Sequence, residues 1–169
     1  MTNQKLGRPS KETNALVRGL VSDLLWFGKI ETTAAKARSV RSKAEKLITL
    51  AINSYEDTVK VVKEIKDDKG VKVKTEVVND GPKKLNARRA IMSYVYDRQE
   101  QRKPKESIDA YKARVEGINH PLLEKIFNVY APKYAKRAKE LGQGGGYTRI
   151  IKLGQRRGDA SEMVVIELI

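Results

Sequence analysis

The sequence predicts an α+β protein. Two long segments carry apolar residues at helical spacing, a short β-prone segment stands between them, and two β-rich runs near the end of the chain are placed to pair as an antiparallel hairpin. Helices that share one core with a small sheet are the arrangement that this mixture of periodicities favours.

The first helix is expected from Thr13 to the glycine at position 28. Its apolar residues lie on one side, and a glycine just past the last periodic residue is a common helix end. The apolar positions are Leu16, Val17, Leu20, Val21, Leu24 and Leu25. Residues 29–33 follow as a short strand, and Thr32 or Thr33 is suited to cap the next helix.

Residues 34–53 have the clearest helical pattern. One apolar stripe follows the i, i+3, i+4 rule, and it consists of Ala37, Val40, Ala44, Leu47, Ile48 and Ala51. At about 100° per residue, three lysines fall on one flank of the stripe (Lys36, Lys43 and Lys46) and two arginines on the other (Arg38 and Arg41). Glu45 is the only acid among them, so this helix is expected to face a polyanion, although a solvated basic flank would give the same pattern.

Two segments differ from the rest of the one domain that is expected to span residues 13–169. Residues 55–82 suggest a short helix around Val62, a strand from Val71 and a turn at the end. Residues 99–119 suggest a mobile loop with a short helix around Tyr111. Their charges nearly cancel, at six lysines against seven acids in the first and five cations against four acids in the second. Between them, residues 85–96 are expected to be helical.

The C-terminal part is expected to contain two helices and a hairpin. A helix begins at His120-Pro121, where the proline suits the first helical position, and a shorter one covers residues 134–141. Residues 147–152 are then expected to pair with residues 163–168, so that the connecting loop presents Arg156 and Arg157.

Composition restricts the function. Among 169 residues, Lys and Arg number 35 and Asp and Glu 21, which gives a net charge of +14. The two near-neutral segments contribute none of this excess, so the positive charge is concentrated elsewhere and calls for a polyanionic partner. With no cysteine and one histidine, disulfides, cysteine metal sites and most zinc or triad sites are excluded. No cofactor, metal, catalytic residue or small-molecule substrate is expected.

The first residues are polar, and no stretch of about 18 apolar residues occurs. A cytoplasmic protein without a membrane partner is therefore expected. Residues 1–12 are expected to form an extended basic arm that orders on its target, since they contain too few apolar residues to fold alone.

Residues 142–159 combine a glycine run, Tyr147 and four cations, which suits a surface that approaches phosphate groups closely. Tyr147 could stack on a base or fill the core. A nucleotide-binding enzyme is disfavoured because the glycine run lacks the Gly-Lys-Ser/Thr ending of a P-loop. A DNA-binding architectural protein remains the main alternative on charge alone. The tripeptide 157–159 matches a cell-adhesion motif, and a cationic loop with a glycine turn is the preferred interpretation.

Six blocks of the sequence, in this order along the chain, resemble the bacterial-type large-subunit ribosomal protein seventeen (bL17) family. They are Lys5–Arg8, Ile30–Arg38, Leu47–Ala51, Ala87–Arg89, Gly145–Asp159 and Glu167–Leu168. The resemblance implies a two-layer α+β fold, in which a small mixed sheet of the N-terminal strand and the C-terminal hairpin is covered by helices. This sequence departs from the family at Gln4 and at Thr13-Asn14, where the family is more basic, so weaker RNA binding by the arm is expected. The blocks leave out residues 55–82 and 99–119, so the resemblance implies that these two segments are insertions.

The resemblance also implies a non-catalytic constituent of the large ribosomal subunit. Such a protein would bind and staple large-subunit ribosomal RNA during assembly, contact neighbouring ribosomal proteins and lie near the outer end of the peptide exit tunnel. The RNA-binding residues expected from the charge pattern and the resemblance together are Lys5, Arg8, Arg18, Lys29, Thr32, Thr33, Lys36, Arg38, Arg41, Tyr147, Thr148, Arg149, Lys152, Arg156 and Arg157.

Overall fold

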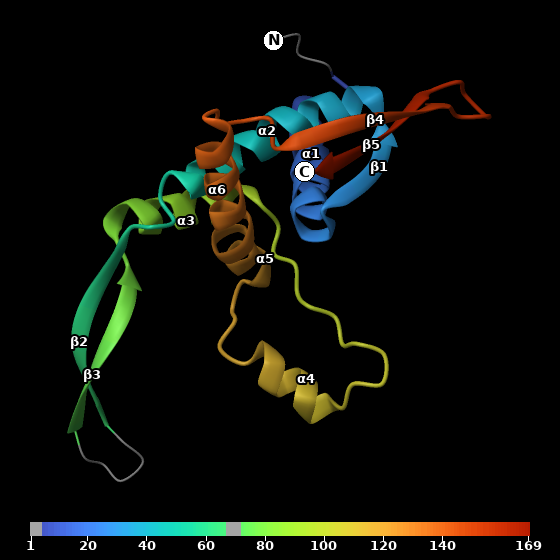
Figure 1. Ribbon diagram of the computed structural model, residues 1–169. Coiled ribbons are helices and arrows are strands. Elements are labelled where there is room, and N and C mark those ends of the chain that lie inside the picture. Colours follow the sequence, from blue (N-terminus) through green and yellow to red (C-terminus); the bar gives the residue numbers. More distant parts are fainter. Residues whose placement is uncertain (1–4, 67–71) are drawn as a thin grey trace.

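A computed structural model describes residues 5–66 and 72–169 of the chain and shows a helical body with a small sheet on one side and two extensions (Figure 1). The elements in chain order are α1 (Ser10–Phe27), β1 (Lys29–Thr33), α2 (Ala34–Ile52), β2 (Thr58–Lys66), β3 (Lys72–Asp80), α3 (Pro82–Tyr94), α4 (Ile108–Val115), α5 (Pro121–Lys125), the π-helical turn η1 (Ile126–Tyr130), α6 (Ala131–Leu141), β4 (Thr148–Gln155) and β5 (Glu162–Leu168). The α+β class expected from the sequence is confirmed.

The main sheet joins the two ends of the chain. Its strand order is β1-β5-β4, so the N-terminal strand pairs with the C-terminal hairpin as expected. Both pairings are antiparallel, with Ile166 opposite Ile30 on one side and Ile150 on the other. The expectation of a mixed sheet is therefore wrong in this detail, because β1 runs against β5 just as β4 does.

Helices cover one face of this sheet and form the core with it. Val164 and Ile166 of β5 are buried against apolar residues of α1 and α2, and the helices from α5 to α6 complete the cluster. The buried stripe of α2 consists of Ala37, Val40, Ala44, Ile48 and Ala51, which are members of the stripe expected from the sequence. The apolar pattern therefore identifies the face of α2 that packs inward.

Residues 121–141 form one continuous helical rod instead of two separate helices. α5 passes through η1 into α6, and the amide of Ala131 donates to the carbonyl of Ile126, five residues earlier. Pro132 has no amide hydrogen and would disrupt a regular α-helical turn, and the wider π turn before it lets the chain continue. The proline changes the type of turn without ending the rod.

The helix expected within residues 55–82 is wrong, because residues 58–66 form strand β2 and pair with β3 in a separate two-stranded sheet. Three apolar positions are too few to define a helical period, whereas neighbouring β-branched valines favour a strand. Asp68-Lys69-Gly70, the segment expected to end that helix, lies outside the described residues.

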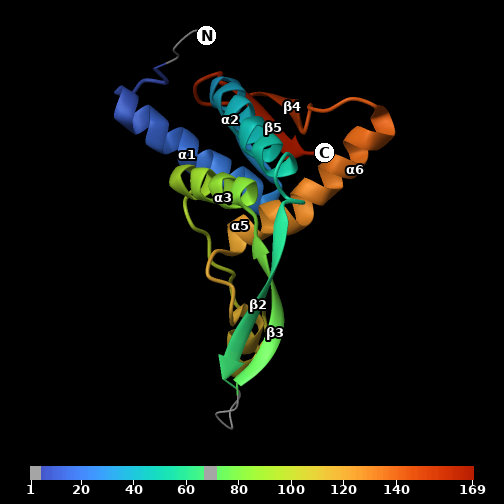
Figure 2. The same cartoon turned by 90° about the vertical axis from the view of Figure 1, so that its left-hand side faces the viewer.

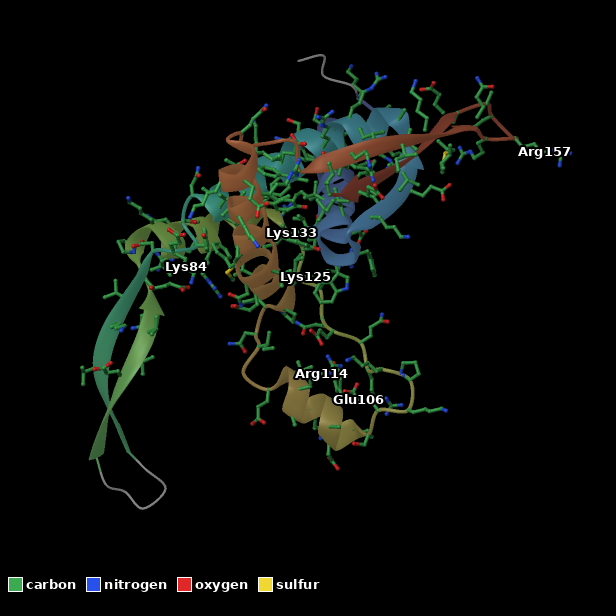
Figure 3. The ribbon with its side chains drawn as sticks, viewed as in Figure 1. Lys84, Glu106, Arg114, Lys125, Lys133 and Arg157 are labelled. Atoms are coloured by element: carbon green, nitrogen blue, oxygen red, sulfur yellow. The ribbon has the colours of Figure 1, made fainter. Side chains whose placement is uncertain are left out.

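Both near-neutral segments extend from the same end of the body. Figures 1 and 2 show the β2–β3 hairpin and the α4 segment on the side away from the β4–β5 hairpin and the N-terminal end of α1. α4 confirms the short helix around Tyr111, and the Ser107 side chain caps it by accepting from the amide of Ala110. Arg114 holds the loop before α4 through Glu106 at 2.9 Å and through Glu100 (Figure 3).

Candidate nucleic-acid interface

The outward face of α2 carries a shallow basic groove. It is lined by Arg38, Arg41, Ser42, Glu45, Lys46 and Thr49. Glu45 accepts from Arg41 Nε at 3.4 Å and from Thr148 Oγ1 at 2.7 Å, so it connects the groove to the start of β4. Glu45, the acidic residue of the groove, is therefore already hydrogen-bonded within the protein. The groove keeps a net positive charge from Arg38, Arg41 and Lys46.

The structure adds Lys46 to the residues expected from the sequence. Lys46 lines the same groove as Arg38, although the sequence pattern placed the two residues on opposite flanks of α2. Eight residues along an α-helix correspond to a rotation of only about 80°. The signal for Lys46 in the sequence is this small angle to Arg38, whereas its position relative to the apolar stripe does not show it.

The β4–β5 hairpin projects from the body and carries a second group of cations. Figure 3 shows Arg157 at its far tip, pointing away from the core. Arg149 donates to Glu167 Oε1 from Nε at 2.9 Å, and Arg156 donates to Asp159 Oδ1 from Nε at 2.9 Å. Lys152 and Arg157 take part in none of the ion pairs found among residues 5–66 and 72–169, so they are the cations of this hairpin most available to a phosphate.

The tip of this hairpin is also held in shape by its ion pair. The hydrogen bond from Arg156 lowers the pKa of the Asp159 carboxyl below its ordinary value, and the amide of Ser161 assists. The same hydrogen bond raises the pKa of Arg156. Both groups are therefore charged at neutral pH, and the loop between the strands is closed by a charge-assisted contact.

The residues before α1 form a turn and not a wholly extended arm. The amide of Arg8 donates to the carbonyl of Lys5, and Thr13 Oγ1 donates to the same carbonyl at 2.8 Å. Leu6 packs against the core, and α1 begins at Ser10, three residues earlier than the sequence indicated. Lys5 and Arg8 thus stand exposed on an anchored turn, while residues 1–4 lie outside the described part of the chain.

Arg18 is used inside the fold. Its Nε donates to the carbonyl of Tyr94 at 2.7 Å and its Nη2 to the carbonyl of Ser93 at 2.9 Å, at the C-terminal end of α3. The guanidinium also lies over the ring of Tyr96 at 4.9 Å. A cation at a helix C-terminus stabilises that helix, so the structure gives Arg18 a packing role that its sequence position did not suggest.

Three of the uncharged candidates are buried. Tyr147 is 6% exposed, and its ring centroid lies 4.9 Å from that of Tyr134, so the structure decides between core packing and stacking in favour of the core. Thr148, the first residue of β4, and Thr32, the last but one of β1, are buried as well. Of the three, Thr148 contacts the groove through its hydrogen bond to Glu45.

The strand-to-helix junction is partly exposed. Thr33 occupies the N-cap position of α2, as expected, but its side chain makes no capping hydrogen bond. Lys29 stands exposed at the start of β1, an edge strand of the main sheet, and Lys36 is half-buried in the first turn of α2. Lys29 therefore lies at the open edge of the main sheet, whereas Lys36 is not among the residues that line the groove.

A further group of cations lies on α6, the helix that leads into the glycine run. α6 carries Lys133, Lys136, Arg137 and Lys139, and Gly142 ends it in the left-handed conformation with φ +64°. Arg137 Nη1 donates to the carbonyl of Gly146, which fixes the loop to α6. Lys133 lies over the ring of Tyr134 at 5.3 Å (Figure 3). The close spacing of these cations is visible in the sequence, and the fold brings Arg137 onto the carbonyl of Gly146.

The described part of the chain contains neither a metal-binding cluster nor a membrane-spanning helix. Within residues 5–66 and 72–169, no three His, Asp or Glu side chains are grouped so that they could hold a metal ion. No helix in that same part of the chain is both long and apolar enough to cross a membrane.

Comparison with known proteins gives a consistent result. Residues 16–169 match the family described as Ribosomal protein L17. Large ribosomal subunit protein bL17 of Acetivibrio thermocellus is 36% identical over 190 residues, and that of Lachnospira eligens is 38% identical over 185 residues, with 98% of both chains covered in each case. The bL17 protein of Thermoanaerobacter pseudethanolicus is 35% identical over 169 residues, which cover 100% of both chains. The chain therefore belongs to the ribosomal protein L17 family.

Proposed function

We propose that this chain is a structural, non-catalytic constituent of the large ribosomal subunit in the cytoplasm, and that it binds and staples large-subunit ribosomal RNA during assembly. Family membership supports this role. The observation that carries it is the basic groove of α2 beside the β4–β5 hairpin, since both present cations on elements that the core holds rigidly.

The proposed RNA-binding surface consists of the exposed cations and the half-buried Lys36, with the buried candidates as support. Its members are Lys5, Arg8, Lys29, Lys36, Arg38, Arg41, Lys46, Lys152 and Arg157. Arg41 among these members, together with Arg149 and Arg156, contributes less, because each of the three already forms an ion pair with a carboxylate. Cations on a fixed scaffold neutralise crowded phosphates and release counterions, and they recognise the shape of folded RNA more than its bases.

Charge reversal on α2 tests the proposal. We expect Arg38→Glu combined with Lys46→Glu to weaken binding to a large-subunit ribosomal RNA fragment more than tenfold. The slope of log affinity against log salt should fall by about two, one per lost phosphate contact. Filter binding at several salt concentrations measures both quantities, and circular dichroism checks that the variant is folded.

A matched control uses two exposed cations outside the proposed surface. Arg102→Glu with Lys112→Glu makes the same change in net charge within the near-neutral segment 99–119, and we expect less than a twofold effect. Equal losses in the two double variants would contradict a localised RNA-binding surface. Equal affinity for duplex DNA at the same salt concentration would favour the DNA-binding alternative.

A position near the outer end of the peptide exit tunnel is supported by the family resemblance. A photoreactive group placed at Arg157 in assembled subunits tests it, because the crosslinked nucleotides identify the neighbouring RNA. Crosslinks confined to RNA far from the tunnel outlet would contradict this position and leave RNA binding itself unaffected.

A further inference from the structure

The β2–β3 hairpin is rigidly fixed at its root. Asp57 precedes β2, and its Oδ2 accepts from the amides of Lys83 at 2.8 Å and Lys84 at 3.4 Å in the first turn of α3. The amide of Gly81 donates to the carbonyl of Asp57 at 2.8 Å. The entry to β2 and the exit from β3 are therefore tied to each other and to the start of a helix.

Ion pairs extend this fixation into the body. Asp80 at the end of β3 bonds Lys84 Nζ at 2.8 Å and Arg88 Nε at 3.2 Å. Arg88 also pairs with Glu124 of α5 and lies over the ring of Phe127 at 5.5 Å. Figure 3 labels Lys84, which lies near the root of the hairpin. The direction of the hairpin is thus set by the body and not left to a flexible linker.

The two faces of the hairpin differ in character. The register places Val61 opposite Val77, with Val59 next to them on the same face, and this defines the valine face. The other face alternates Lys60 and Glu76 with Val62 and Val78. Val59 and Val61 are 45% and 37% exposed although no layer of this chain covers them within the described residues.

A two-stranded ribbon of this kind is only marginally stable alone in water. β2 has nine residues, which corresponds to a length of about 30 Å, and within the described residues its only strand partner is β3. Contiguous valines on a long, fixed and uncovered ribbon are typical of a surface that another molecule completes.

The charge of the segment indicates the kind of molecule. Residues 55–82 carry six lysines and seven acids, whereas the rest of the chain holds the positive excess. The hairpin also leaves the body on the side away from the β4–β5 hairpin (Figures 1 and 2). A polyanion would gain little binding free energy from a surface without net positive charge. An apolar protein surface would gain binding free energy by burying the valines.

We propose that the valine face of the β2–β3 hairpin docks onto an apolar surface of a second, different protein of the large subunit. This inference rests on the proposed function, because it takes the ribosome as the setting. It assigns separate partners to the two ends of the molecule: RNA at the basic groove of α2 and the β4–β5 hairpin, and protein at the β2–β3 hairpin.

Site-specific photocrosslinking in assembled large subunits tests the proposal with the full-length chain. A benzophenone amino acid is placed at Val61, at Val62 or at Arg157 in separate variants, and the adducts are identified by mass spectrometry and primer extension. Val61 and Val62 are neighbours on opposite faces, so Val62 is the matched control. We expect position 61 to give an adduct with one other ribosomal protein at several times the yield of position 62, and position 157 to give RNA adducts.

Other outcomes at position 61 would overturn the proposal. These are adducts with RNA, adducts with a second copy of this chain, no adduct, or a yield no greater than at position 62. If position 157 still gives RNA adducts in the same particles, the proposed function stands while the docking surface fails. A protein adduct at position 61 without RNA adducts at position 157 would support docking and count against the proposed RNA surface.

A retention assay gives a second readout. Washing subunits at high salt weakens the contacts to phosphate, so the apolar contact then carries more of the binding. We expect Val59→Asp with Val61→Asp to lower retention of the protein about tenfold, and Val62→Asp with Val78→Asp to change it less than twofold. Equal retention of the two double variants would contradict docking through the valine face.

Discussion

Two tyrosines one helical turn apart in the core differ in the hydrogen bonding of their hydroxyl groups. Tyr130 donates to the carbonyl of Leu25 at 2.9 Å. Tyr134 is fully buried, and its hydroxyl has no hydrogen-bond partner among the described residues. A buried polar group without a partner costs stability, so the two residues are expected to respond oppositely to removal of the hydroxyl.

We expect Tyr134→Phe to raise the free energy of unfolding by about 1 kcal/mol, because the ring keeps its packing while the unpaired hydroxyl is removed. The matched variant Tyr130→Phe should lower it by about 1 kcal/mol, since the carbonyl of Leu25 loses its donor. Urea denaturation followed by circular dichroism at neutral pH measures both. Destabilisation by Tyr134→Phe of the same size as by Tyr130→Phe would contradict this account.

Burial also makes stability depend on alkaline pH. It raises the pKa of Tyr134 to about 12, from an ordinary value of 10.0. The unfolded chain therefore loses this proton first, and above pH 10 it binds fewer protons than the folded state. Stability should fall as the pH rises from about 10 to about 12, by about 1–2 kcal/mol from this residue.

Denaturation midpoints at pH 9 and pH 11.5 test the effect. Tyr134→Phe should show a smaller decrease than the unchanged protein over this interval. Some decrease remains in the variant, because burial raises the pKa of Tyr130 as well. Identical decreases in the two proteins would show that Tyr134 is not the group responsible.

At the level of elements, the junction between β3 and α3 depends on the absence of a side chain at Gly81. A Cβ atom built at this position would lie 2.4 Å from the carboxylate carbon and both oxygens of Asp57. That carboxylate accepts a hydrogen bond from the first free backbone amide of α3. The Asp57 side chain therefore both caps the helix and holds the root of the hairpin. The backbone φ of Gly81 is −71°, which shows that close approach and not backbone conformation requires the glycine here.

We expect Gly81→Ala to destabilise the protein by about 1–3 kcal/mol, since the methyl group would displace Asp57 and remove the cap. Gly144→Ala is the control, because a Cβ there would meet no atom within 4 Å. Thermal unfolding compares the two variants. Equal melting temperatures would show that Asp57 moves aside at no cost.

At the scale of the whole molecule, one core supports surfaces of different character. The sheet, α1, α2, α3 and the rod from α5 to α6 share the buried cluster, and among the residues whose burial the structure describes, β2, β3 and α4 contribute none to it. The β2–β3 hairpin begins and ends at the hydrogen-bonded pair formed by Asp57 and Gly81. The core should therefore fold without the hairpin.

We expect a variant in which two glycines replace residues 58–80 to unfold in a single cooperative transition. Its stability should fall by only about 1 kcal/mol, which corresponds to loss of the partly exposed ion pairs of Asp80. Calorimetry measures the transition, and binding to the RNA fragment should change less than twofold. Loss of cooperative unfolding would show that the hairpin contributes to the core.

Local information in the sequence was sufficient for much of the fold. The long apolar stripe of α2, the glycines that end α1 and α6, and the short segment after Gly28 each depend on residues near one another in the chain. β2 was wrongly predicted as helical for the same reason, because its state depends on pairing with β3. The family, too, could be recognised from the sequence, since each of its six blocks is an unbroken stretch of the chain.

What only the tertiary structure decided is which polar residues remain free for RNA. Arg18 binds carbonyls about 75 residues away, and Thr148 donates to Glu45, which lies 103 residues earlier in the chain. Tyr147 is buried because the fold sets it against Tyr134. Sequence alone determined that the chain is an α+β protein with a concentrated positive charge. The availability of each cation depends on partners brought close by folding, and no local pattern contains that information.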